Sequence, residues 1–272
     1  MSSGKEEYKD RGSLVLKRVL TGLVGLPIVL VAVYEGAWLM TLLMIALAVL
    51  AIAELQNLFR AKRIATSSIA YWFAILYFGA LHQGAIHLSL QLVVALCAVL
   101  LARQLITFPA FSLTEVGANL LAALYPSLLL GNFVLLRAEA GAVWALAAII
   151  GVWAYDAFAY GIGIQFGRVR PWPDISPKKS VEGALGGFLG SILVFMAAHS
   201  FLRLTMPWAV LLGLIVGMVG QVGDLAESAL KRFVGVKDSG TLLPGHGGIL
   251  DRFDSLMFSA TAVYWVWMAT TL

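Results

Sequence analysis

The feature that most constrains this chain is a succession of apolar stretches that fills almost its whole length. Each stretch is close to the roughly 20 residues that a helix needs to cross a bilayer. Only 12% of the residues are charged, whereas soluble domains carry about 25%, so the chain cannot cover a globular surface with polar groups. We therefore predict an all-α, polytopic integral membrane protein with about nine transmembrane helices, at residues 14–34, 36–58, 66–81, 88–106, 114–136, 141–165, 182–203, 207–232 and 249–270.

The positive charges are distributed unevenly between the loops. If the N-terminus is cytoplasmic, seventeen of the nineteen Lys and Arg residues lie on the cytoplasmic side, and only Arg137 and Arg203 lie outside. The positive-inside rule thus predicts a cytoplasmic N-terminus and an external C-terminus. The loops 166–180 and 233–247 then lie on the same, cytoplasmic side of the membrane.

Three regions differ in character. Residues 1–13 form a polar N-terminal leader, and the first apolar stretch has no small-residue cleavage site after it, so we expect it to remain as a span. Residues 14–140 are sparsely polar and are interpreted as a transmembrane scaffold. Residues 141–272 hold nearly all the intramembrane charge and are interpreted as the catalytic region. Cys97 is the only cysteine, which excludes a disulfide framework and a cysteine-based metal site.

A polar cluster lies between Gly223 and Ser255, flanked by apolar runs. Asp224, Glu227, Ser228 and Lys231 are spaced i, i+3, i+4 and i+7, which places them on one helix face. Asp251, Asp254 and Ser255 repeat the i, i+3, i+4 pattern at the start of the last span. Carboxylates at membrane depth are costly unless they are paired or bind a cation, and Mg²⁺ prefers carboxylates and phosphates as ligands. The alternative is that Asp224 pairs with Lys231, and Asp251 with Arg252, only to orient the helices.

A glycine-rich segment, Pro244-Gly245-His246-Gly247-Gly248, joins the two helices. Glycines allow a backbone to approach a ligand closely, and the free N–H groups at the start of the last span favour phosphate. The neighbouring cations that favour this interpretation are Lys231, Arg232, Lys237 and Arg252. His246 is interpreted equally well as structural or as catalytic.

A second cluster begins at Asp156 in the sixth span. An isolated intramembrane aspartate indicates a functional site. Lys178 and Lys179 in the following loop can bind phosphates or anionic lipid heads. Ser180 is predicted to cap the seventh span. Four glycines after it indicate close helix packing rather than ligand binding: Gly183, Gly186, Gly187 and Gly190.

These residues together resemble a known family. Ser228-x-x-Lys231-Arg232, Lys237-Asp238, Pro244-Gly245-His246-Gly247-Gly248 and Asp251-Arg252-x-Asp254 resemble the signature of the phosphatidate cytidylyltransferases, or CDP-diacylglycerol synthases. Asp156 with Ala159-Tyr160, Gly167-Arg168 and Ile175-Ser176-Pro177-Lys178-Lys179-Ser180-x-Glu182-Gly183 resembles a second block of that family. One departure is Ser180, where threonine is common, and both residues carry a hydroxyl. The resemblance covers about residues 150–256.

The resemblance implies that CTP and phosphatidate react to CDP-diacylglycerol and pyrophosphate, with Mg²⁺ required and a second cation such as K⁺ in the same centre. It also implies that Asp224, Asp251 and Asp254 bind metal, to which we add Glu227 and Asp156 as candidates. The expected catalytic residues are Asp224, Lys231, His246, Asp251 and Asp254. The expected substrate-binding residues are Lys178, Lys179, Ser180, Ser228, Arg232, Lys237, Gly247, Gly248 and Arg252.

We expect this enzyme in the cytoplasmic (inner) membrane, with its active site facing the cytoplasm and with no nucleic-acid partner. A homodimer is one arrangement that we consider. Two other functions fit parts of the pattern. A CTP-dependent polyprenol or diacylglycerol kinase would use similar chemistry but transfer the γ-phosphoryl group. A cation-coupled transporter could bind its ion at Asp156, Asp224 and Asp251, but we find no internal repeat of the kind that transporters often have.

Overall fold

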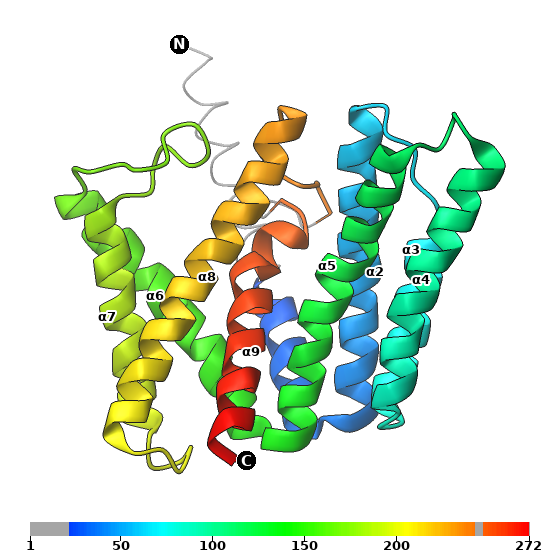
Figure 1. Ribbon diagram of the computed structural model, residues 1–272. Helices are drawn as coiled ribbons and strands as arrows, with labels where there is room; N and C mark the ends of the chain where they lie inside the picture. Colours follow the sequence, from blue (N-terminus) through cyan, green and yellow to red (C-terminus); the bar gives the residue numbers. More distant parts are fainter. Residues whose placement is uncertain (1–21, 243–246, 272) are drawn as a thin grey trace.

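The structure is a computed structural model that describes residues 22–242 and 247–271, and its regular structure there is helical. The helices run side by side, with their loops gathered at two opposite ends (Figure 1). The prediction of an all-α fold is confirmed. In chain order the elements are Gly22–Glu35, α2 (Ala37–Ala61), α3 (Ile69–His82), α4 (Ile86–Thr107), α5 (Leu113–Leu135), the π-helical turn η1 (Leu136–Ala140), α6 (Ala142–Phe166), α7 (Val181–Ala198), α8 (Met206–Val234) and α9 (Leu250–Thr271).

The helix boundaries agree closely with the predicted spans. Residues 14–21 of the first predicted span lie outside the described residues. The largest difference is at the seventh span, which we expected to reach residue 203. Helix α7 ends at Ala198, and the chain then turns until Arg203, whose φ of 55° is incompatible with a continuing right-handed helix. Helix α5 continues through Pro126 up to Leu135.

Six helices in the described part of the chain are long and apolar enough to cross a membrane. They are α2, α4, α5 with η1, α6, α7 and α8. The protein is therefore a polytopic membrane protein. Helix α3 has 14 residues and is about 21 Å long, which is shorter than a hydrocarbon core of roughly 30 Å. Helix α9 has 22 residues but begins with the charged residues Asp251, Arg252 and Asp254.

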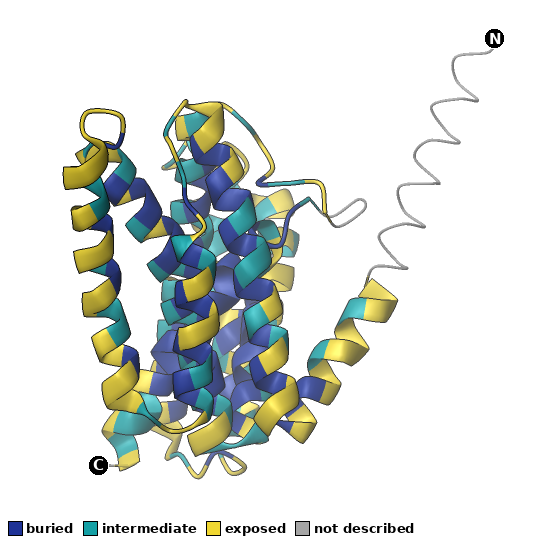
Figure 2. Ribbon diagram, turned by 90° about the vertical axis from the view of Figure 1, so that its right-hand side faces the viewer, coloured by how far each residue is buried: buried dark blue, intermediate teal, exposed yellow. Residues whose placement is uncertain are grey.

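The outward faces of the helices carry large apolar side chains. Figure 2 shows exposed residues along the outer helix surfaces and buried residues between the helices. Leu105, Val94 and Trp72 are among the most exposed apolar side chains, with 83%, 69% and 64% of their surface accessible. A soluble protein rarely exposes so much apolar surface, whereas lipid tails solvate it.

The helices pack in two groups that meet at α9. Helices α6, α7, α8 and α9 follow one another in space, each packed against the next, and α9 also packs against α6. Helices α2, α3 and α4 gather around α5, and α5 packs against α9. The start of α9 is consequently surrounded by residues from both groups.

Glycines allow α6 and α7 to approach closely. A Cβ atom at Gly190 would lie 2.6 Å from the carbonyl oxygen of Ala154, and one at Gly187 would lie 2.5 Å from the ring of Tyr155. Both distances are shorter than van der Waals contact. The prediction that these glycines serve helix packing is confirmed, and the same packing brings Tyr155 and Asp156 beside the loop that precedes α7.

The described residues of four connections lie at the same end of the molecule, at 62–68, 108–112, 167–180 and, after α8, 235–242 with 247–249 (Figure 1). The Ser180 hydroxyl fixes the end of the loop 167–180 by accepting a hydrogen bond of 3.1 Å from the Gly183 N–H, so the predicted N-cap is confirmed. Gly235 ends α8 in a left-handed conformation with φ 86°, which glycine adopts without strain. The two polar segments of the sequence therefore lie at one end of the helices.

Candidate active site

Lys231 lies at the centre of the polar residues that join α8 to α9. Its ammonium Nζ forms an ion pair of 2.6 Å with Asp251 Oδ1 and a second, shorter one with Glu227 Oε2. Glu227 is almost completely buried, and no hydrogen bond reaches its Oε1. The i, i+4 spacing of Glu227 and Lys231 within α8 accounts for one ion pair, and the packing of α9 supplies the other.

Asp251 accepts hydrogen bonds at both carboxylate oxygens. Its Oδ2 accepts from the backbone N–H of Gly248 at 2.8 Å and from that of Ser239 at 2.9 Å, with the Ser239 hydroxyl at 3.0 Å. Its Oδ1 accepts from Lys231. Asp251 therefore connects three segments: the end of α8, the loop after it and the start of α9.

The start of α9 is capped by a residue that the sequence analysis did not select. Glu54 of α2 is buried, and its Oε1 and Oε2 accept the N–H groups of Ile249 at 2.7 Å and Leu250 at 3.0 Å. We expected free N–H groups there for phosphate. That expectation is wrong for Gly248, Ile249 and Leu250, because Asp251 and Glu54 already accept their hydrogen bonds.

Asp224 belongs to a second part of the site, between α6, α7 and α8. Lys179 Nζ lies 2.6 Å from its Oδ2 and forms an ion pair. The Ser228 hydroxyl donates a weaker hydrogen bond of 3.3 Å to Oδ1. Asp224 and Lys179 both line a cavity of about 250 Å³. The cavity is also lined by Tyr155, Asp156, Ala159, Tyr160, Gly163, Lys178, Ser180, Gly183, Ala184 and Gln221.

The ion pairs differ from those considered in the sequence analysis. Asp224 pairs with Lys179 instead of Lys231, and Asp251 pairs with Lys231 instead of Arg252. The reason is that the loop before α7 and the end of α8 offer closer partners than the same helix does. Each pair therefore joins two segments, which a sequence pattern within one helix does not reveal.

Asp156 and Asp254 complete the acidic residues around the cavity. Asp254 is buried and accepts a 2.6 Å hydrogen bond from the N–H of the adjacent Ser255. Asp156, Asp224 and Asp254 are close enough that their negative charges act on one another. Neither Asp156 nor Asp254 forms an ion pair within residues 22–242 and 247–271.

These carboxylates fit a phosphate-bound Mg²⁺ better than a site made by the protein alone. In the described part of the chain, no three Asp, Glu, His or Cys side chains converge tightly enough to enclose a metal ion. Mg²⁺ is commonly held by one or two carboxylates, together with water and substrate phosphates. Asp156, Asp224 and Asp254, of which Asp156 and Asp254 have no ion-pair partner among the described residues, offer that kind of donor set.

The other predicted site residues lie around these two parts. Arg232 donates to the carbonyl oxygens of Ile175 at 3.2 Å and Val236 at 2.7 Å, so it ties the loop 167–180 to the end of α8. Lys237 and Arg252 are exposed at the same end. Gly247 has φ 81°, and a Cβ there would lie 2.6 Å from Asp251 Oδ2. His246 lies outside the described residues.

Three further residues of this region were not predicted: Glu54, Ser239 and Gln221. The Tyr155 hydroxyl donates a hydrogen bond of 2.5 Å to the Gln221 side-chain oxygen beside the cavity. Glu54 had a usable signal, because it is the only acidic residue between Glu35 and Glu115 and lies within an apolar stretch. An acidic residue in such a stretch indicates function by default.

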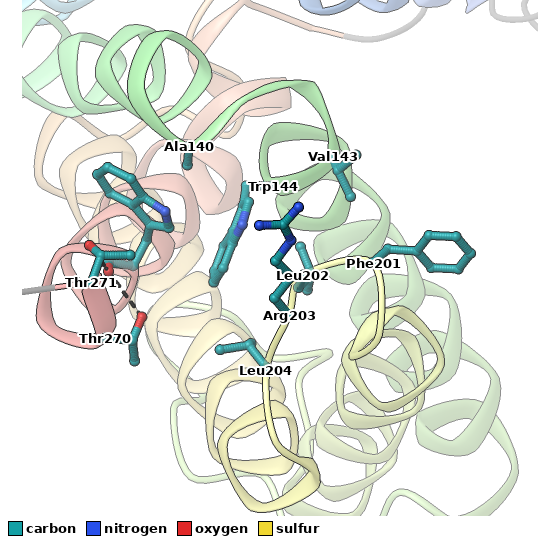
Figure 3. A pocket seen from close by; sticks show the side chains of 10 residues that line it. Ala140, Val143, Trp144, Phe201, Leu202, Arg203, Leu204, Thr270 and Thr271 are labelled. Carbon is teal, nitrogen blue, oxygen red and sulfur yellow. Dashed lines mark hydrogen bonds between the residues drawn. The ribbon is translucent and has the colours of Figure 1, made fainter.

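A larger cavity of about 420 Å³ lies at the opposite end of the helices, near the end of α9. Figure 3 shows Arg203 reaching into it beside Trp144. None of its lining residues is acidic, and none was predicted for the site. This cavity is therefore separate from the candidate active site.

Comparison with known proteins identifies close relatives over most of the chain. The model of the cytidylyltransferase family matches residues 16–270. The phosphatidate cytidylyltransferase of Staphylococcus epidermidis is 38% identical over 247 residues, covering 89% of this chain and 94% of that protein. The phosphatidate cytidylyltransferase of Bacillus subtilis is 35% identical over 263 residues, covering 92% and 96%. That of Staphylococcus aureus is 36% identical over 246 residues.

Proposed function

Since the chain belongs to the cytidylyltransferase family and is a CTP:phosphatidate cytidylyltransferase, we propose that its two substrates react at the cavity between α6, α7 and α8. In this reaction an oxygen of the phosphatidate phosphate forms a bond to the α-phosphorus of CTP. The bond from that phosphorus to the β-phosphate oxygen breaks, and pyrophosphate leaves. The observation that carries the proposal is the Lys179–Asp224 ion pair in the wall of a cavity that Lys178 and Asp156 also line.

The chemistry suits a site whose main contribution is charge. A phosphomonoester loses its second proton near pH ~6, so phosphatidate is largely dianionic at neutral pH and needs no dedicated base. The barrier lies in bringing two anions together, which positioning and charge neutralisation lower. Lys178 and Lys179 would bind phosphates inside the cavity, and Lys231 would do so beside it. Arg232, Lys237 and Arg252 would neutralise charge at its cytoplasmic rim.

Mg²⁺ is proposed as the cofactor. When bound, it would supply charge neutralisation and polarisation of the phosphoryl oxygens. Asp224 and Asp254 would hold it, with Asp156 beside them. Asp251 and Glu227 would join only by exchanging Lys231 for the cation, because that ammonium already contacts both. A second cation such as K⁺ would have the same carboxylates available.

The lipid substrate would reach the cavity sideways from the bilayer. Tyr160 of α6 lines the cavity and is 72% exposed, and Leu185 of α7, next to the lining residue Ala184, is 61% exposed. Apolar side chains at the rim of a polar cavity allow acyl chains to stay in the membrane while the phosphate enters. CTP would come from the aqueous side, through the loops 167–180 and 235–249.

We propose nine membrane spans with a cytoplasmic N-terminus. In this topology the loops after α6 and α8 face the cytoplasm, and the protein lies in the inner membrane. The support is the uneven distribution of Lys and Arg together with the position of both loops at one end of the helices. Residues 14–140 would serve as scaffold and residues 141–272 as the catalytic region. A homodimer would keep both sites complete, because every residue proposed for the site comes from one chain.

The direct test is an assay of the purified protein with phosphatidate, labelled CTP and Mg²⁺. The expected products are a lipid-linked cytidine nucleotide and pyrophosphate in equal amounts. A CTP-dependent lipid kinase would instead release CDP and leave no cytidine on the lipid. The second outcome would contradict the proposed reaction.

A further inference from the structure

Glu54 is a buried carboxylate in the part of the chain that otherwise resembles an apolar scaffold. It lies in α2, and only 6% of its surface is accessible. A buried carboxylate is costly unless hydrogen-bond donors surround it. Within residues 22–242 and 247–271, the donors that reach Glu54 come from residues 185 to 196 positions later in the chain. The fold therefore provides a specific environment for this one side chain.

Among the described residues, the donors to Glu54 are backbone and hydroxyl groups, not cations. Its two oxygens accept the N–H groups of Ile249 and Leu250, and Oε2 also lies 2.8 Å from the Ser239 hydroxyl. The first N–H groups of a helix have no partner within the helix, and a negative charge there is stabilised by the helix dipole. Glu54 therefore fixes where α9 begins and how it is oriented.

Ser239 connects Glu54 to Asp251. Its hydroxyl oxygen lies 2.8 Å from Glu54 Oε2 and 3.0 Å from Asp251 Oδ2, but a hydroxyl has only one proton to donate. Asp251 Oδ2 already accepts two backbone N–H groups, from Ser239 and Gly248. The proton is therefore best assigned to the bond with Glu54, while the Ser239 N–H holds Asp251.

We propose that Glu54 is a positioning residue for the cytidylyl transfer. It holds Ser239 and the start of α9 so that Asp251 is in place to orient Lys231. Within the described residues, the Glu54 side chain bonds to Ser239, Ile249 and Leu250, none of which we assign to substrate binding. This inference rests on the proposed function, because the role of Lys231 near the reacting phosphates belongs to that proposal.

The backbone of Gly240 and Gly248 packs closely around the Glu54 carboxylate. A Cβ atom at Gly248 would overlap with the Ser239 hydroxyl and with Glu54 Oε2. One at Gly240 would lie 2.9 Å from Glu54 Oε1. The carboxylate is thus enclosed by the backbone that it orders, and a small change in its chemistry must act on that backbone.

Glu54→Gln tests the proposal with almost no change in volume. An amide has one acceptor oxygen and places an NH₂ group where the second oxygen accepted a hydrogen bond, so a donor then faces a backbone N–H or the Ser239 hydroxyl. Supporting residues of this kind typically alter activity by roughly 10–100-fold. We expect kcat to fall by that factor while KM for phosphatidate stays within about twofold of the wild-type value.

Glu139→Gln is the matched control. Glu139 accepts a hydrogen bond of 3.0 Å from the Tyr264 hydroxyl at the opposite end of α9, and an amide oxygen can accept the same bond. Its kcat should remain at the wild-type value. A wild-type kcat in folded Glu54→Gln, or an equal loss in both variants, would overturn the proposal.

A second variant, Ser239→Ala, covers a Glu54→Gln protein that does not fold. Ser239→Ala removes only the connecting hydroxyl, and its kcat should fall with KM for phosphatidate unchanged, whereas an unchanged kcat would overturn the proposal. Where Glu54→Gln folds, a double variant adds a second measurement: Ser239→Ala should then lower kcat little further, since both substitutions break the same connection. Full additivity would contradict a shared connection.

Hydrogen exchange at the amides of Ile249 and Leu250 gives a readout that does not depend on activity. Exchange should be faster in Ser239→Ala and in folded Glu54→Gln than in Glu139→Gln and the wild-type protein. Unchanged exchange would overturn the proposed anchoring. An inactive wild-type protein with the expected exchange pattern would instead contradict the proposed function and leave the anchoring of α9 supported.

Discussion

Lys231 Nζ and Asp251 Oδ1 lie 2.6 Å apart and join the last turn of α8 to the first turn of α9. Glu227, one turn earlier on α8, contacts the same ammonium. One cation is thus shared between two carboxylates, and neither is available to another ligand without a rearrangement. This shared contact holds the end of α8 against the start of α9.

Asp251→Asn should abolish formation of the lipid-linked cytidine product while the protein still inserts and folds. The amide leaves Lys231 with one carboxylate partner fewer. It also places an NH₂ group beside Lys231 or beside the N–H groups of Ser239 and Gly248. Breaking a buried ion pair costs about 3–5 kcal/mol. We expect a loss of at least about 100-fold in kcat/KM. The assay uses labelled CTP, with Asp174→Asn as control, because Asp174 is exposed in the loop 167–180. Turnover at the wild-type level in Asp251→Asn would refute the assignment of Asp251 to the catalytic site.

Lys179→Gln should weaken substrate binding more than it affects folding. The variant removes a positive charge from the cavity wall and leaves Asp224 without its ion-pair partner. A lost hydrogen bond to a charged group costs about 1.5–3 kcal/mol, so we expect KM for one substrate to rise roughly tenfold or more. Steady-state kinetics with each substrate varied in turn identifies which phosphate Lys179 contacts. Lys62→Gln, which lies outside the cavity above the Phe233 ring, should leave both KM values unchanged.

Asp254→Asn should raise the Mg²⁺ concentration needed for half-maximal activity. Asp254 is the buried member of the three mutually repelling aspartates and has no ion-pair partner in the described part of the chain. Removing its charge should weaken cation binding by at least about tenfold. A Mg²⁺ titration of activity in the variant and in Asp174→Asn measures the shift. Identical titration curves would remove Asp254 from the proposed metal site.

The helices and the polar cluster could be predicted from the sequence because both depend on local patterns. Apolar length determines the position of a span, and the i, i+3, i+4 spacing of Asp224, Glu227 and Ser228 puts them on one face. The N-cap at Ser180 was also predicted, and its hydrogen bond to Gly183 confirms it. Each of these features is contained in one continuous stretch of sequence.

Except for the Glu227–Lys231 pair within α8, the partners of the charged residues could not be predicted, because they come from other segments of the chain. Lys179 reaches Asp224 across 45 positions of the sequence, and Glu54 reaches Ile249 across 195. The sequence at the start of α9 predicted that its N–H groups bind an anion. They do bind one, but it is the Glu54 carboxylate and not a phosphate. The anion at these N–H groups is a carboxylate of the same chain, which no pattern near residue 249 indicates.

Gly248→Ala should inactivate the enzyme, whereas Gly161→Ala should not. The added methyl group at Gly248 would overlap with Ser239 and Glu54, so the loop must move away from Asp251. At Gly161, within α6, a Cβ meets no atom within 4 Å, and alanine favours a helix by roughly 0.5–1 kcal/mol over glycine. Activity per folded molecule and thermal unfolding in detergent separate the two variants. An active Gly248→Ala would show that this loop tolerates displacement.

Single cysteines should report opposite sides of the membrane for the two ends of the helices. Cys97 is the only native cysteine, so Cys97→Ser provides a background without thiols. On that background, Asp174→Cys in the loop 167–180 should react with a membrane-impermeant maleimide only after the cells are opened. Phe201→Cys, between α7 and α8, should react in intact cells, because Phe201 is 77% exposed at the opposite end. The proposed orientation follows from the positive-inside rule, and labelling in the reverse order would place the active site outside the cytoplasm, where CTP is not supplied.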